Sequence, residues 1–313
     1  MTAFLVVVAL AVVLPWAAAP AARRLAGLLP PREASLALTG AAVLLAGGTA
    51  AALIGLFHVP FLATLEDLSF AQVITNWPVV VPVSCAAGVL LGVQAVRLAL
   101  AVRRHRVLLS RAWKLTGEGA AEGDVLVVPG EEAEAFALPR HRGRAGRVVV
   151  TEGMLRALAP SERAVLLAHE RAHLRGRHHV LASVADLATA VHPALRQLGA
   201  ALEFHLERWA DEAAAAVVGD RKVAATAIAR AALAGSAGPG GRGHGFLSVS
   251  TGPVPRRVRA LLEPEPTGPD GRGPRAAAAG LVAVVVVSGL LALGLAYGLH
   301  EYVEEVARTV VGR

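Results

Sequence analysis

The chain has 313 residues, of which 55% are hydrophobic and only 18% are charged. This composition excludes an ordinary soluble protein of this size and favours an integral membrane protein. The 31 basic residues outnumber the 24 acidic ones, which gives a net charge of +7. Because the arginines cluster beside apolar runs, we interpret them as topological anchors and expect no direct nucleic-acid binding. The single Cys85 excludes an intrachain disulfide and a cysteine-based zinc site.

Four apolar runs are long enough to cross a bilayer, which takes about 20 residues. They cover residues 2–22, 35–57, 79–102 and 276–299. The first run offers small residues for signal-peptide cleavage, but arginines follow it rather than precede it, which favours a retained helix. We therefore expect four transmembrane helices. Residues 103–275 would form a polar domain between the third and the fourth, and residues 300–313 a short tail.

The distribution of arginine predicts the orientation in the membrane. The loop of residues 23–34 is basic, whereas residues 58–78 contain no lysine or arginine, and arginines return directly after residue 102. Since loops rich in Lys and Arg stay in the cytoplasm, the domain of residues 103–275 would be cytoplasmic and both termini extracytoplasmic. We thus expect a multi-pass protein of the cell membrane, with the lipid bilayer as a partner.

Short strands separated by glycine-rich or charged turns are expected early in the polar domain. They cover residues 124–128, 135–138 and 147–150. The last strand would be the sheet edge that pairs with an extended substrate. A helix with Ser161 as its N-cap would follow.

Further helices are expected over residues 180–218, with a break at Pro193, and over residues 221–233. The apolar stretch of residues 180–204 contains Asp186, His192 and Arg196. We interpret it as an amphipathic or membrane-skimming hairpin, not as a fifth span.

The segment AHERAHLRGRHH contains a candidate metal site. His169 and His173 are four residues apart, so that one helix face would bring both imidazoles to a single ion. Glu170 follows the first histidine, which completes an HExxH pattern. In this pattern zinc activates a water and polarises a peptide carbonyl, while the glutamate takes up the water's proton and later donates it to the leaving amine.

One completion of this site uses Gly176 and His179, which extend the motif to HExxHxxGxxH, the metzincin pattern. Metzincins also need a methionine turn after the motif, but Met1 and Met154 both precede it. We therefore interpret His178 and His179 as a basic helix end, favourable to the helix dipole when charged.

The other completion lies in ERWAD, residues 207–211. Glu207 could ligate from an adjacent antiparallel helix, and Asp211, one turn later, could accept a hydrogen bond from a ligating histidine and fix its tautomer. The sequence thus predicts one Zn²⁺ per chain held by His169, His173 and Glu207, with Glu170 as the catalytic base and Asp211 in support.

HExxH combined with ExxAD is typical of glu-zincin membrane peptidases. The segments AFALPRHRGRAGRVVVTEGMLRAL, SERAVLLAHERAHLRGRHH and VPRRVRALLEP together resemble the BlaR/MecR-type antirepressor family of integral-membrane zinc metallopeptidases. The resemblance implies a mainly α membrane protein with a cytosolic α+β gluzincin-type domain between the third and fourth transmembrane helices. It also implies a protein or peptide substrate, such as a cognate transcriptional repressor.

One departure limits the resemblance. The β-lactam sensors of that family carry a large extracellular penicillin-binding domain after the last helix, where this sequence has residues 300–313, and the chain contains no SxxK motif. Sensing of β-lactams by acylation is therefore not expected. What the resemblance implies is the peptidase chemistry and the topology.

We expect a membrane-anchored zinc endopeptidase that cleaves a cytosolic or membrane-proximal protein. HtpX-like and CAAX-prenyl-type peptidases, which act in quality control and processing, share the zinc pattern and are an alternative. A non-catalytic membrane scaffold with structural zinc is another, although such a site would not need Glu170. Candidate donors to the transition-state oxyanion are His205, His244 and Arg256, of which His205 is expected to point away from Glu207.

Overall fold

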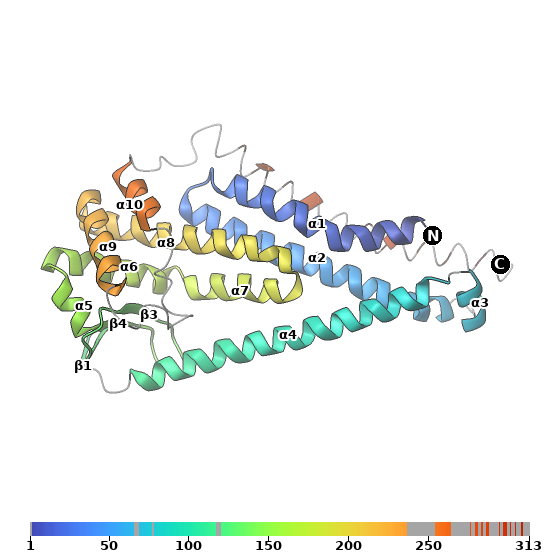
Figure 1. Cartoon of the computed structure of the whole chain (residues 1–313), viewed down its shortest axis with the longest axis horizontal. Coiled ribbons are helices and arrows are strands. Elements are labelled where there is room, and N and C mark those ends of the chain that lie inside the picture. Colours follow the sequence, from blue (N-terminus) through green and yellow to red (C-terminus); the bar gives the residue numbers. More distant parts are fainter. Residues whose placement is uncertain are drawn as a thin grey trace.

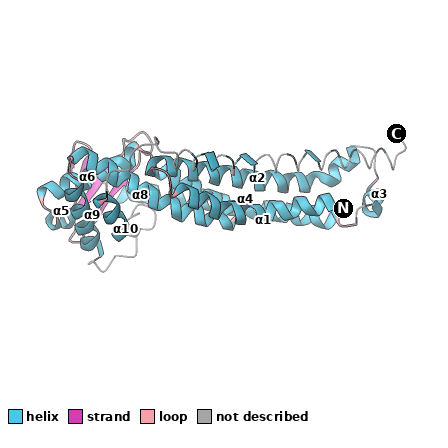
Figure 2. Ribbon diagram, turned by 90° about the horizontal axis from the view of Figure 1, so that it is seen from above, coloured by secondary structure: helices cyan, strands magenta, loops and turns pink. Residues whose placement is uncertain are grey.

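The computed structural model describes residues 2–65, 69–76, 78–116, 120–236 and 254–263, together with isolated positions from residue 276 onwards. Three long helices, α1 (Thr2–Ala26), α2 (Pro31–Leu65) and α4 (Val80–Leu115), lie side by side along the long axis. The short α3 (Phe70–Asn76) sits at one end of this bundle, and the sheet lies at the other end (Figures 1 and 2).

Within the described part of the chain, two helices are long and apolar enough to cross a membrane, at Pro31–Phe61 and Val80–Leu115. They include the runs expected at residues 35–57 and 79–102. The side chains of residues 1–12, and most of residues 276–313, lie outside the described part of the chain. The expected fourth helix at 276–299, the tail at 300–313 and the sides of the termini therefore stay predictions.

Helix α4 does not end at residue 102, as the arginines suggested, but continues to Leu115. No proline or glycine interrupts residues 93–115, and arginine is a good helix former. The arginines after residue 102 therefore end the apolar run but not the helix. Near its end, Trp113 packs with Leu126, Leu138 and Val149 of the sheet and donates a hydrogen bond of 2.9 Å to the carbonyl of Pro139. A helix that could span the membrane thus carries the sheet directly.

The sheet contains β1 (Ala120–Glu122), β2 (Val125–Val128), β3 (Ala135–Leu138) and β4 (Arg147–Thr151) in the order β1-β2-β4-β3. β4 pairs in parallel with β2 and antiparallel with β3. The expectation that residues 147–150 form the sheet edge is therefore wrong: β4 is internal, and the edge strands are β1 and β3. The three consecutive valines of β4 are all buried, as expected of a strand covered on both faces.

The remaining helices follow in chain order. They are α5 (Glu152–Ala157), α6 (Pro160–Arg175), α7 (His178–Val191), α8 (Arg196–Val218), α9 (Arg221–Ser236) and α10 (Val254–Leu262), with a 3₁₀ turn at Pro193–Leu195. Ser161 is not the N-cap of α6. The helix begins at Pro160, and the Glu162 carboxylate accepts a hydrogen bond of 2.9 Å from the backbone N–H of Ala159. Proline at the first position needs no N–H partner.

Helices α7 and α8 form the hairpin expected over residues 180–204, with its turn at Pro193. The hairpin buries Ala185, Leu198 and Leu202 against Leu38 and Ala22 of the long helices. Helix α8 then continues past the hairpin and packs its second half against α6 and α9, where Ala214 is buried with Val165. One uninterrupted helix therefore connects the long helices to the helix that carries HExxH.

Candidate metal centre

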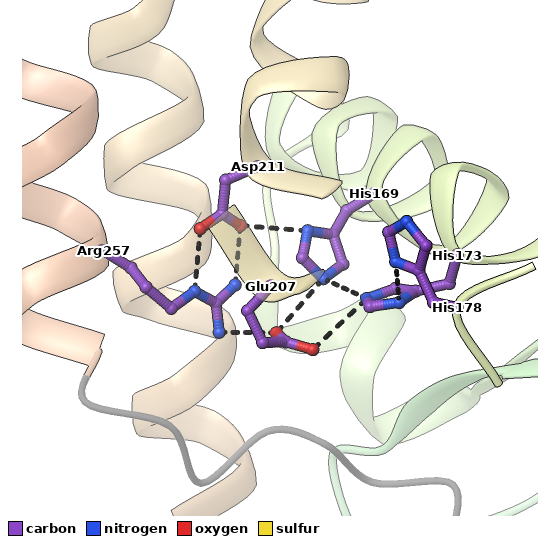
Figure 3. Close-up of polar contacts among 6 residues, drawn as sticks. All are labelled: His169, His173, His178, Glu207, Asp211 and Arg257. Atoms are coloured by element: carbon purple, nitrogen blue, oxygen red, sulfur yellow. Dashed lines mark hydrogen bonds and ion pairs between the residues drawn. The ribbon is translucent and has the colours of Figure 1, made fainter. Parts of the chain in front are cut away.

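Helix α6 brings the two histidines of the motif together, and α8 adds the carboxylate. The Nε2 atoms of His169 and His173 are 3.1 Å apart. Glu207 places Oε2 at 3.6 Å from His169 Nε2 and Oε1 at 3.4 Å from His173 Nε2. Figure 3 shows the three side chains converging from the two helices. Each offers one ligand atom, and all three atoms lie within 4.8 Å of one another.

These spacings fit a zinc ion. Ligand atoms about 2.0–2.1 Å from a tetrahedral zinc are about 3.3 Å from one another. The two imidazole nitrogens show this spacing, and each of them lies at a similar distance from a different oxygen of Glu207. The buried Oε1 of Glu207 has no hydrogen-bond partner in the described part of the chain. The described residues supply no fourth ligand and do not include His179 in the group. Two imidazoles and a carboxylate with an open position are typical of catalytic rather than structural zinc.

A buried ion-pair network contacts two members of the triad, His169 and Glu207. Asp211 places Oδ1 at 3.0 Å from His169 Nδ1. Arg257 of α10 donates to both oxygens of Asp211, at 2.7 and 2.6 Å, and its Nη1 lies 2.8 Å from Glu207 Oε2 (Figure 3). Arg257 therefore connects Glu207, the expected third metal ligand, to Asp211, which is expected to orient His169.

Burial alone would raise the pKa of Asp211, but the hydrogen bonds from Arg257 and His169 outweigh it and lower that pKa to about 2. Burial would similarly lower the pKa of His169, yet the Asp211 and Glu207 carboxylates raise it to about 10. The same negative field that favours a proton on this imidazole favours a metal cation beside it. Burial, with His169 and His178 nearby, lowers the pKa of His173 to about 3, so this ring is neutral, as a metal ligand must be.

Glu170 is buried beside the edge strand. Burial raises the pKa of its carboxyl to about 7, although a hydrogen bond from the backbone of Ala137 in β3 opposes the shift. A carboxyl whose pKa lies near neutrality can both accept and return a proton at physiological pH. The charges of His169 and Glu207 also shift this pKa, so the carboxyl lies close to the triad.

His178 differs from its expected role as a charged helix end. It is buried, it begins α7, and its Nδ1 lies 2.8 Å from Nδ1 of His173. Burial, together with the charge of His169, lowers the pKa of His178 to about 4, so the ring is neutral. The interpretation as a basic helix end is wrong for this residue.

The candidate oxyanion donors do not gather at the triad. Arg256 lies over the ring of Phe204, with its guanidinium carbon 4.6 Å from the ring centroid. His205 is buried with an edge contact to Phe204, and burial lowers its pKa to about 4. His244 lies outside the described residues. Sequence reasoning named Arg256 but missed Arg257, its neighbour, although both stand in the arginine-bearing segment of the resemblance.

Comparison with known proteins identifies the chemistry of this region. Residues 103–204 match the model of Peptidase family M48, a family of zinc metallopeptidases. The match includes His169, Glu170 and His173 and ends before Glu207 and Asp211. It supports a hydrolase that acts on peptide bonds, as the sequence predicted, but does not extend to the BlaR/MecR type. Neither the curated proteins nor the solved structures give a match.

Proposed function

We propose that the chain is a membrane-anchored zinc endopeptidase that cleaves an extended segment of a membrane-proximal protein on the cytosolic side. The observation that carries the proposal is the convergence of His169, His173 and Glu207 beside a buried Glu170, within and next to a region that matches a metallopeptidase family. A zinc ion bound there would acidify a water and polarise the scissile carbonyl.

The chain's own residues would manage the proton. The Glu170 carboxylate accepts a proton from the attacking water and delivers it to the nitrogen of the leaving amine. Asp211 Oδ1 lies 3.0 Å from Nδ1 of His169 and would accept the proton of that nitrogen in the metal-bound protein, which would leave the Nε2 lone pair of the ring for the metal. Arg257 neutralises the two carboxylates from the side opposite the histidines, so that neither is left as an isolated buried charge.

The edge strand β3 would align the substrate. The Thr151 N–H donates to the carbonyl of Glu134, and alternation along the antiparallel ladder directs the backbone groups of Ala135 and Ala137 away from β4. The Ala137 N–H already reaches Glu170. A substrate strand added along this edge would therefore run directly past the catalytic carboxylate, with little demand on its sequence.

Two structural features favour a membrane-proximal substrate. The site is built on α8, whose first half packs on α1 and α2, while α4 carries the sheet. A substrate of this site must therefore lie close to the membrane. A transcriptional repressor, expected from the resemblance to antirepressors, is one such substrate if it can approach the inner membrane surface.

The test compares the parent chain with Glu170→Gln, both purified in lipid nanodiscs, on a library of extended fluorogenic peptides and on a co-expressed candidate repressor. We expect both proteins to bind zinc equally and the variant to lose cleavage by about 10²–10⁴-fold. Cleavage by Glu170→Gln at the parental rate would overturn the proposal. Equal zinc without cleavage by either protein would support a non-catalytic scaffold instead.

A further inference from the structure

The two histidines of the motif have different supports behind them. Nδ1 of His169 faces the carboxylate of Asp211, the kind of partner that metal-bound histidines usually have. Nδ1 of His173 faces another histidine, His178, at 2.8 Å. His178 comes from the start of α7 rather than from α6, and its ring is among the most buried polar groups of the described chain.

The geometry determines which nitrogen carries each proton. Nε2 of His173 faces His169 and Glu207, so its lone pair must stay free if it is to bind a metal. The proton of a neutral His173 ring then sits on Nδ1, and His178 can only accept it through its own Nδ1 lone pair. His178 must carry its proton on Nε2, which is buried and has no hydrogen-bond partner among the described residues.

A buried N–H without a hydrogen-bond partner destabilises the folded protein. Packing contacts around the His178 ring help to offset this loss. The rings of His178 and Trp209 lie 4.5 Å apart between centroids. Gly176 provides the necessary space, because a Cβ at this position would lie 2.4 Å from His178 Nε2. The φ of Gly176 is −74°, which any residue can adopt, so the glycine is required by the close approach of the ring and not by the backbone.

This group of side chains also reaches the long helices. The guanidinium carbon of Arg32, in the first turn of α2, lies 5.8 Å from the centroid of the Trp209 ring. The position of His178 is therefore determined jointly by the end of α6, by α7, by α8 and by one of the helices that could span the membrane.

We propose that His178 is a positioning residue for the metal ligand His173: it accepts the Nδ1 proton of that ring and so keeps Nε2 turned toward the ion with its lone pair free. This inference rests on the proposed metal site and adds to it a residue outside the HExxH and ExxAD patterns. The glycine that extends the motif toward a metzincin pattern then has another explanation, because Gly176 makes room for His178.

The test is zinc affinity, measured by competition with a chromophoric chelator on the full chain in nanodiscs. His178→Leu keeps the volume of the ring but removes the acceptor, and we expect it to bind zinc about 10–100-fold more weakly. His178→Asn places an amide oxygen close to the original Nδ1 position, and we expect it to bind zinc at least about tenfold more tightly than His178→Leu. His179→Ala, the adjacent histidine, is the matched control and should keep the parental affinity.

A second readout separates positioning from simple packing. With Co²⁺ in place of zinc, the visible spectrum of His178→Leu should change in shape, while that of His178→Asn should stay close to the parent. If His178→Leu fails to fold, Gly176→Ala serves instead, since its Cβ displaces the ring, and we expect the same weakening of zinc binding.

Parental zinc affinity in a folded His178→Leu or Gly176→Ala protein would overturn the inference, and so would equal loss in the Leu and Asn variants. A parent chain that binds no zinc would instead contradict the proposed function, which keeps the two failures distinct.

Discussion

Arg257 donates two hydrogen bonds to the carboxylate of Asp211, at 2.7 and 2.6 Å, although 46 residues separate them in the chain. Both side chains are almost completely buried, and the same guanidinium contacts Glu207. Helix α10 is therefore attached to α8 by charge as well as by the apolar contacts of Leu261. A planar guanidinium can donate two parallel hydrogen bonds to one carboxylate and contact a second, a geometry that an ammonium does not reproduce.

Replacing Arg257 by Met should destabilise the protein by about 3–5 kcal/mol, because it removes the guanidinium from two buried carboxylates and leaves them only the His169 ring as a cation. Arg257→Lys should recover only a small part of this loss. The measurement is the thermal denaturation of the zinc-depleted protein in nanodiscs. Arg256→Met is the matched control, since this neighbour is exposed and lies over Phe204, and an equal effect of the two Met variants would contradict the role of Arg257.

Much of the candidate site could be predicted from local spacing. The separation of four residues between His169 and His173, and again between Glu207 and Asp211, places each pair on one helix face whatever the tertiary structure. Arg257 and His178 could not be found in this way, because their contacts depend on how α10 and α7 pack. The chain alone gives no period or spacing that relates position 257 to position 211.

The sheet shows the same difference between features that depend on local spacing and features that depend on packing. Periodicity located β2, β3 and β4 almost to the residue, but the edge was assigned to the wrong strand. A signal was present, since three consecutive valines without polar alternation favour an internal strand. Helix α4 extended past its expected end for a related reason: arginine marks where an apolar run stops, not where a helix stops.

Substitution of Ala135 by Pro tests the substrate edge. This residue should direct its N–H away from β4, so proline there would remove a donor of the outer edge and no hydrogen bond of the ladder. We expect kcat/KM for extended peptides to fall about tenfold, the equivalent of one lost hydrogen bond, while zinc content and thermal stability stay unchanged. Unchanged kcat/KM in a folded variant would argue against strand addition at β3.

Gly153 tests how the sheet and α5 are joined, and Gly199 in α8 is its matched control. A Cβ on Gly153 would lie 2.2 Å from the carbonyl oxygen of Glu131, so Gly153→Ala must push the start of α5 away from the segment preceding β3. The Thr151 hydroxyl holds that segment through Glu132 and Glu134, which leaves it little freedom to move.

We expect Gly153→Ala to cost about 1–3 kcal/mol in thermal denaturation, as overpacking does. In α8, Gly199→Ala meets nothing within 4 Å and should stabilise the helix by about 0.5–1 kcal/mol. Equal stabilities for the two variants would show that the close approach at Gly153 is relieved without cost.

The central claim is that two imidazoles of α6 and one carboxylate of α8 bind a single ion. Its most direct test is the zinc content, by elemental analysis, of the parent chain and of the Glu207→Ala and His179→Ala variants after identical purification. We predict one zinc per chain in the parent and in His179→Ala, and almost none in Glu207→Ala. A parent without zinc, or a Glu207→Ala protein that retains it while His179→Ala loses it, would contradict the account.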